Sequence, residues 1–156
     1  MCRTSAQPIS DALALLKELR SVKDEATRTA MVRALDLLGD SRAATALARL
    51  VKDPSLSARL RGYAAEALGS CGYKSRVALQ VLHAALADAE PEVRFFAAFA
   101  FGALAERYDI MAGPTTIDSL KRLLRDHSAV GKFGTVADDA EYALQTIRRA
   151  AKRRQS

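Results

Sequence analysis

Histidine and cysteine, the side chains that most often bind metals or act as nucleophiles, are few in this chain and lie far apart. The two histidines are His83 and His127, and the two cysteines are Cys2 and Cys71. Neither histidine has a glutamate beside it, and no short spacing brings any two of these four residues together. A metal site needs three or four such ligands, and a thiol needs a nearby base to become reactive. The sequence therefore predicts no metal site, no cofactor and no catalytic residue.

Two further segments resemble functional motifs without meeting their requirements. The stretch GKFGT, residues 131–135, lacks the spacing and the Gly-Lys-Ser/Thr ending of a phosphate-binding loop. Asp138 and Asp139 follow shortly after it, and acidic residues at the start of a helix are favoured by the positive end of the helix dipole. We therefore expect both aspartates to be solvated, and we favour a protein without enzymatic activity.

The chain repeats one pattern of residues. LRGYAAEALG at 60–69 and VRFFAAFAFG at 93–102 both read apolar-Arg-x-x-Ala-Ala-x-Ala-apolar-Gly, and they lie 33 residues apart. A weaker copy is AMVRALDLLG at 30–39, and a degenerate copy is VADDAEYALQ at 136–145, where Gln145 replaces the glycine. Because repeats of this length are typical of stacked helical units, each copy is expected to form one helix of such a unit.

Each copy is preceded by an amphipathic segment that ends in aspartate. In these segments the apolar residues recur with the i, i+3, i+4 spacing of an amphipathic helix. The closing aspartates are Asp24, Asp53, Asp88 and Asp126. The sequence therefore predicts an all-α fold, an α-α superhelix of four helix pairs and eight helices. We expect one domain at residues 10–151, between a flexible tail at 1–9 and a basic tail at 152–156.

The stretches LRGYAAEALG and LADAEPEVRFFAAFAFGAL resemble the HEAT-like repeat of the phycobilisome-lyase type, and the resemblance extends over about residues 10–149. It implies a solenoid whose second helices line the concave surface. It also implies that the aspartate ending a first helix interacts with the arginine of the second helix. This would pair Asp53 with Arg61 and Asp88 with Arg94. The family spans lyase subunits, hydroxylases with His-Glu iron ligands, DNA-repair proteins and scaffolds, so it indicates fold rather than function.

Two faces of the second helices emerge when positions are counted back from the last residue of each copy, at about 100° per residue. The residues one, two, four, five and nine before it form the expected packing face, which in the two middle units is rich in alanine, as at Ala64 and Ala97. The residues three, six and seven before it lie on the opposite side. They are Asp36, Arg33, Val32, Glu66, Tyr63, Gly62, Phe99, Phe96, Phe95, Tyr142, Asp139 and Asp138.

This opposite side is the predicted partner-binding surface, an aromatic patch edged by acidic side chains. The residues expected to contact a partner are Tyr63, Glu66, Phe95, Phe96, Phe99, Asp139 and Tyr142. Such a patch is large for the surface of a monomer. Two alternatives stay open for the phenylalanines. They face a partner, or they are buried, with the loop 127–137 folded over them and Phe133 as a plug.

Composition and charge limit the possible classes of protein and partner. Hydrophobic residues make up 49% of the 156 residues and charged residues 27%, as in an ordinary globular domain. No stretch has the length of a signal peptide or a membrane span, so we expect a cytoplasmic protein with no membrane partner. The net charge of +6 permits nucleic acid or an acidic protein as partner. Basic residues crowd the C-terminal end, at Arg148, Arg149, Lys152, Arg153 and Arg154.

Three hypotheses for the function follow from these observations. The leading one is a scaffold without enzymatic activity that binds a protein segment on its concave face. One alternative is a chromophore-lyase-like enzyme subunit that uses the same aromatic face for a flat ligand. Another is a nucleic-acid-binding protein that uses the basic tail and the convex edge. We expect a monomer or a weak end-to-end dimer, because Ala12 to Leu16 spread apolar residues around the first helix.

Overall fold

The computed structural model of the chain describes residues 7–110 and 112–156, and within them it contains eight α-helices and no β-strand. The helices are α1 (Gln7–Leu19), α2 (Glu25–Leu38), α3 (Ala44–Lys52), α4 (Ala58–Cys71), α5 (Arg76–Ala85), α6 (Pro91–Tyr108), α7 (Pro114–Leu123) and α8 (Val136–Arg153), with a short 3-10 helix, η1 (Ser41–Ala43). The predicted all-α fold of eight helices is confirmed. None of the helices described is both long and apolar enough to cross a membrane.

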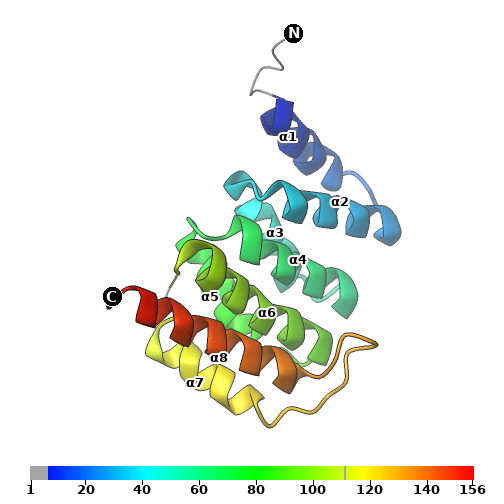
Figure 1. Cartoon of the computed structure of the whole chain (residues 1–156). Coiled ribbons are helices and arrows are strands. Elements are labelled where there is room, and N and C mark those ends of the chain that lie inside the picture. Colours follow the sequence, from blue (N-terminus) through cyan, green and yellow to red (C-terminus); the bar gives the residue numbers. More distant parts are fainter. Residues whose placement is uncertain (1–6, 111) are drawn as a thin grey trace.

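The helices stack in two layers (Figure 1). Helices α2, α4, α6 and α8 pack side by side in chain order, and we call them the second-helix layer. Behind them α3 packs on α5, while α1 and α7 pack on α2 and α8 at the two ends of the stack. Helix α1 begins at Gln7 and α8 ends at Arg153, a few residues outside the predicted 10–151 domain. Residues 1–6 of the predicted tail lie outside the described residues.

The helix starts follow local capping chemistry. The Ser57 and Ser75 hydroxyls accept hydrogen bonds from the backbone N–H groups of Leu60 and Ala78, at 3.2 and 3.1 Å. Pro91 and Pro114 occupy the first turns of α6 and α7, where the missing N–H of proline costs nothing. These caps fix where each helix of a pair begins, and therefore where its aspartate and arginine lie.

The repeated glycine has two different roles. Gly39 ends α2 in the left-handed conformation, with a φ of 62°. Helix α4 continues past Gly69 and ends at Cys71. At Gly69 the next helix passes close by, because an added Cβ would lie 3.0 Å from the Ala100 Cα. An added Cβ at Gly102 would likewise lie 3.3 Å from the Ala143 Cα. These glycines let α4, α6 and α8 touch.

The predicted packing face is confirmed in the two middle units. Its members in α4 and α6 are all buried, and Ala64 and Ala97 have no exposed surface. The first unit departs from the pattern, since Val32 is fully buried although it was assigned to the opposite side, and Leu37 is 87% exposed. Helix α2 has no preceding second helix to pack on, because α1 is its only earlier neighbour among the described elements.

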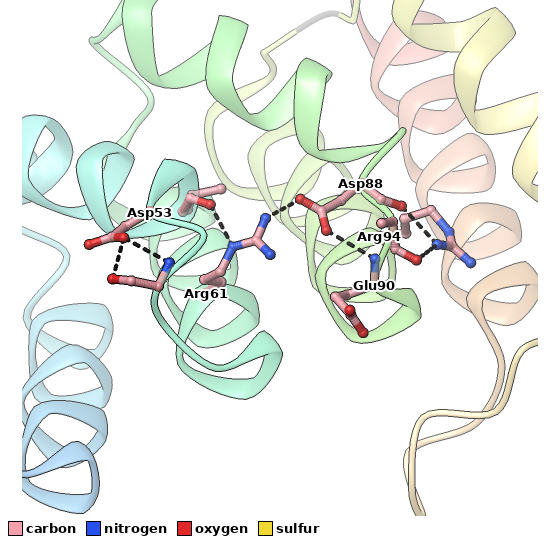
Figure 2. A network of polar contacts seen from close by, with 8 residues as sticks. Asp53, Arg61, Asp88, Glu90 and Arg94 are labelled. Carbon is pink, nitrogen blue, oxygen red and sulfur yellow. Dashed lines mark hydrogen bonds and ion pairs between the residues drawn. The ribbon is translucent and has the colours of Figure 1, made fainter.

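Arginines of the second helices link consecutive units (Figure 2). The Arg61 Nε donates to the Val51 carbonyl at 3.0 Å, at the end of its own unit's first helix, and its Nη2 pairs with Asp88 of the next unit. Arg94 repeats this arrangement one unit later. Its Nη1 donates to the Asp88 carbonyl at 2.8 Å, which Figure 2 also shows. Its Nε pairs with Asp126 at 2.8 Å.

These arginine–aspartate contacts form a ladder along the stack. Its pairs differ from those that the repeat resemblance implies. Arg61 pairs with Asp88 and not with Asp53, whose Oδ1 accepts hydrogen bonds from the backbone and hydroxyl of Ser55. Arg94 uses the backbone carbonyl of Asp88, and its carboxylate partner is Asp126. The physical reason is that carbonyls at a helix C-terminus lack intrahelical donors. These carbonyls accept hydrogen bonds from one edge of each guanidinium, and the other edge then faces the carboxylate of the next unit.

A double-mutant cycle tests this register. We expect Arg61→Met and Asp88→Asn to show a coupling free energy of about 1–3 kcal/mol in urea unfolding, because the pair is partly shielded from water. The matched cycle with Asp53→Asn should give a coupling near zero. Equal coupling to both aspartates would contradict the observed pairing.

Candidate functional site

A pocket of about 270 Å³ opens in the second-helix layer where α4, α6 and α8 meet. Every residue of the predicted partner-binding set except Tyr142 lines it: Tyr63, Glu66, Phe95, Phe96, Phe99 and Asp139. Arg33 of α2 and Phe133 of the loop between α7 and α8 complete its wall. We call it the aromatic pocket.

Phe95 and Phe96 form a buried part of this pocket and are only 5% and 4% exposed. The Phe96 ring lies over Gly62, where an added Cβ would come within 2.7 Å of its Cδ2. Its centroid is 5.2 Å from that of Tyr63 and 5.1 Å from that of Phe95, which it meets edge-on. For these two rings burial is the correct alternative, because α6 has a helix on both sides and its flanks are covered.

Phe133 covers the phenylalanines, as the plug alternative predicted, but it leaves the pocket open. Its ring centroid is 5.9 Å from Phe96 and 6.3 Å from Phe95, while 52% of the residue remains exposed. The loop is pinned by the Val130 N–H, which donates to the Gly134 carbonyl at 2.8 Å. Gly134 has a φ of 127°, which strongly favours glycine and lets the chain turn back beside Phe133.

Tyr142 lies beside the pocket and packs α8 against α6. Its ring stacks on Phe99, with centroids 5.7 Å apart, and passes over Gly102. Its hydroxyl donates to the Glu106 Oε2 at 2.8 Å. Burial and this hydrogen bond raise the pKa of Tyr142 to about 12, so it stays a neutral donor. The half-buried Phe99 ring is thereby held at the edge of the pocket.

Asp139 is the least satisfied polar group of the pocket. Its Oδ2 is buried and has no hydrogen-bond donor among the described residues. Burial, together with the charges of Asp138 and Glu66, raises the pKa of Asp139 to about 7. The expectation that both aspartates are solvated is therefore wrong for Asp139. Asp138 is exposed and closes the helix start, since its Oδ2 accepts from the Thr135 N–H at 2.7 Å.

Glu66 brings a second carboxyl group to the same pocket. Burial and the charge of Asp36 raise the pKa of Glu66, although Arg33 and Arg107 act in the opposite direction. The guanidinium of Arg33 lies over the Tyr63 ring, 5.2 Å from its centroid, in a cation–π contact. The pocket therefore combines aromatic walls, two carboxyl groups with raised pKa values and one cation at its rim.

The repeat register explains why these residues meet. Arg33, Tyr63, Phe96 and Asp139 each stand six residues before the last residue of their copy, so stacking the four second helices brings them together. The repeat pattern predicts that Arg33 lies on this face but indicates no role for it. The signal that identifies it is this shared position in the repeat.

The remaining reactive side chains have structural surroundings. The His83 Nδ1 lies 3.0 Å from the Thr116 Oγ1 and joins α5 to α7. Cys71 is buried, and burial with the charges of Asp36 and Asp40 raises its pKa to about 12, so it stays a thiol. In the described part of the chain, no group of three or more His, Cys, Asp or Glu residues could hold a metal ion. Cys2 lies outside that part.

Part of the predicted basic tail binds the protein itself. The Arg153 Nη2 donates to the Asp109 Oδ1 at 2.9 Å, and the Arg154 Nη2 donates to the Asp109 carbonyl at 2.6 Å. Asp109 ends α6 in the left-handed conformation, with a φ of 51°. These two arginines therefore tie the end of α8 to the connection between α6 and α7.

Replacing phenylalanine by alanine at a buried and at a half-exposed position tests the packing of the pocket. We expect Phe96→Ala to lower the free energy of unfolding by about 3–5 kcal/mol, because it removes a buried ring. Phe133→Ala removes a half-exposed ring and should cost only about 0.5–1 kcal/mol. Urea unfolding measures both changes. Similar losses for the two variants would contradict the burial of Phe96.

Asp139→Asn tests the buried carboxyl through pH. The pKa of Asp139 is raised from 3.8 to about 7, so between these values the folded protein keeps a proton that the unfolded chain has lost. The stability of the wild type should therefore fall as pH rises through this window, by up to about 1.4 kcal/mol per pH unit.

Asparagine has no charge to bury, so the variant should lose this slope. At pH 8 it should exceed the wild type by about 2–4 kcal/mol, and near pH 4 the two should converge. Urea unfolding across this range provides the measurement. As a contrast, Asp138→Asn should be less stable than the wild type at neutral pH, because hydrogen bonds from Thr135 lower the pKa of Asp138. An Asp139→Asn variant with the slope of the wild type would rule out the raised pKa.

The comparison with known families agrees with this architecture. A family model described as HEAT repeats matches residues 55–145, which is more than half of the chain and extends from the start of α4 into α8. No curated protein matches the sequence. The match includes both well-formed copies of the repeat and the residues of α4, α6 and α8 that line the aromatic pocket. The chain belongs to the HEAT-repeat family.

Proposed function

We propose that the chain is a scaffold without enzymatic activity that binds a protein segment along the second-helix layer, with the aromatic pocket as the anchor. HEAT repeats are commonly protein-interaction scaffolds. The observation that carries the proposal is the open pocket itself, in which Tyr63, Phe99 and Phe133 surround a space beside a buried carboxyl group. Binding energy at protein interfaces concentrates where aromatic side chains frame such a desolvated pocket.

The size of the pocket supports a side chain as its occupant. Its volume of about 270 Å³ lies just below the range of roughly 300–1,000 Å³ that is usual for small-molecule sites. A single side chain of a partner segment suits this space better than an extended chromophore does. The chromophore-lyase-like enzyme and the phycobilisome-lyase type of repeat are therefore the weaker proposal.

The charge distribution weighs against nucleic acid as the main partner. Glu66, Asp138 and Asp139 lie in or beside the pocket and would repel phosphate groups. Lys121, Arg122 and Arg125 line a separate hollow, which shares no residue with the aromatic pocket. Arg153 and Arg154 are engaged with Asp109. Nucleic-acid binding through the C-terminal end stays an alternative that direct binding assays at several salt concentrations decide.

The oligomeric state belongs to the same proposal. We favour a monomer or a weak end-to-end dimer through the first unit, where Leu13, Leu37 and Leu38 are exposed. Leu13 lies in the middle of α1, and Leu37 and Leu38 lie at the end of α2, so these side chains are scattered and a dimer formed through them would be weak.

Selection from a library of random peptides displayed on phage tests the proposal. We expect the wild-type protein to enrich a set of peptides, and Phe133→Ala to weaken their binding by about tenfold or more, which corresponds to the loss of about 1.4 kcal/mol at an aromatic anchor. The matched control is Val77→Ala, which alters an exposed apolar residue of α5 and should bind as the wild type does.

Two results would contradict the proposal. A library that yields no binder would remove the evidence for a peptide-binding function. Enriched peptides that bind Phe133→Ala as tightly as the wild type would place the binding surface elsewhere on the molecule.

A further inference from the structure

Asp139, which lines the aromatic pocket, has a hydrogen-bond acceptor without a donor. The Asp139 Oδ2 is buried, and no residue in the described ranges donates to it. A buried polar atom without a partner costs stability, and native proteins hold few of them. The carboxyl group also lies beside those of Glu66 and Asp138, which makes its ionised form still less favourable. This position lacks the cation or donor that a buried carboxylate normally has.

The cation nearest the pocket does not supply that donor. Arg33 lines the pocket, but its guanidinium lies over the Tyr63 ring, and within the described residues it forms no ion pair with either Glu66 or Asp139. Arg107 donates to the Ser70 Oγ at 2.7 Å, away from the pocket. Arg33 is the one cation among the described lining residues, and neither it nor Arg107 offsets the burial that raises the pKa of Glu66. A ligand that brings positive charge would complement this excess.

The shape of the pocket adds a second requirement. The rings of Tyr63, Phe99 and Phe133 line the same pocket as Asp139, so a ligand there contacts aromatic faces as well as the carboxyl group. An aromatic face attracts a cation, and a planar guanidinium stacks on such a ring more readily than an ammonium group does. Arg33 on Tyr63 makes this same contact within the chain.

We propose that the aromatic pocket takes one arginine side chain of a partner segment, whose guanidinium stacks between the rings and donates hydrogen bonds to the carboxyl group of Asp139, with Glu66 as a second acceptor. The inference rests on the proposed scaffold function and names the partner residue that the pocket recognises. A guanidinium presents several donors in a fixed plane, so it can serve both carboxyl groups at once. Citrulline has nearly the same shape without the charge, and lysine has the charge without the plane.

Binding of short peptides to the full chain tests this inference. The probe is the acetylated and amidated peptide Gly-Gly-Arg-Gly-Gly, compared with the same peptide carrying citrulline or lysine. The readout is the NMR signal of the Asp139 carboxyl carbon and of the Phe133 ring at pH 7. The arginine peptide should shift both signals saturably and move the carboxyl carbon toward its deprotonated position. Citrulline and lysine peptides should bind at least about tenfold more weakly.

Two variants make the test specific. Asp139→Asn keeps the shape of the side chain and should abolish the preference for arginine over citrulline. Asp118→Asn removes an exposed carboxylate on α7, paired only with Lys121 at 3.4 Å, and should leave the preference unchanged. Because the asparagine at position 139 removes a buried charge, that variant is expected to be well folded.

The outcomes separate this inference from the proposed function. If peptides selected from the library lose binding in Phe133→Ala, the scaffold function stands. If those peptides then tolerate citrulline in place of arginine, or bind Asp139→Asn as they bind the wild type, the arginine assignment is wrong. Citrulline or lysine peptides as tight as the arginine peptide would overturn it, and so would the absence of any saturable shift with the arginine peptide.

Discussion

Close contact between the second helices is the constraint on which the rest of the structure depends. Ala64 and Ala97 have no exposed surface, and Gly69 and Gly102 face the backbone of the next helix. Small residues at these positions let α4, α6 and α8 touch along their length, which large side chains would prevent. The aromatic rings of the repeat are then displaced to the flank of the layer. There they fill the space between helices and leave the aromatic pocket where four helices and one loop meet.

The ladder of arginine contacts determines how consecutive units are aligned. Each arginine binds a carbonyl of its own unit and a carboxylate of the next, so it fixes the offset between units as well as the pairing of helices. Figure 2 shows both contacts for Arg61. Burial alone would raise the pKa of Asp126, but hydrogen bonds from Ser128 and Arg94 outweigh it and lower that pKa. The offset matters for the pocket, because a shift of one position would separate Tyr63 from Phe96 and Asp139.

The periodic features of the fold could be predicted from the sequence, whereas features that depend on neighbouring units could not. The alanine-rich pattern predicted the helix pairs and the packing face, since both follow from positions within one repeat. The burial of Phe96 depends on Gly62 of another helix, and the partner of Arg61 lies in the following unit. Asp139 resembles an ordinary acidic residue of a first turn until the chain folds. Its burial arises from contacts that no single helix contains.

The contrast between Asp138 and Asp139 shows where local rules are followed and where they fail. Asp138 obeys them, since it caps α8 with Thr135 and remains exposed. Asp139 breaks them, since its Oδ2 is buried without a donor among the described residues and an uncharged residue of the same shape would fit there at lower cost. In proteins whose local and tertiary preferences otherwise agree, such an exception is expected at functional sites. The excess charge of the pocket is thus not explained by how the chain folds, and it supports the proposed binding of a cationic side chain.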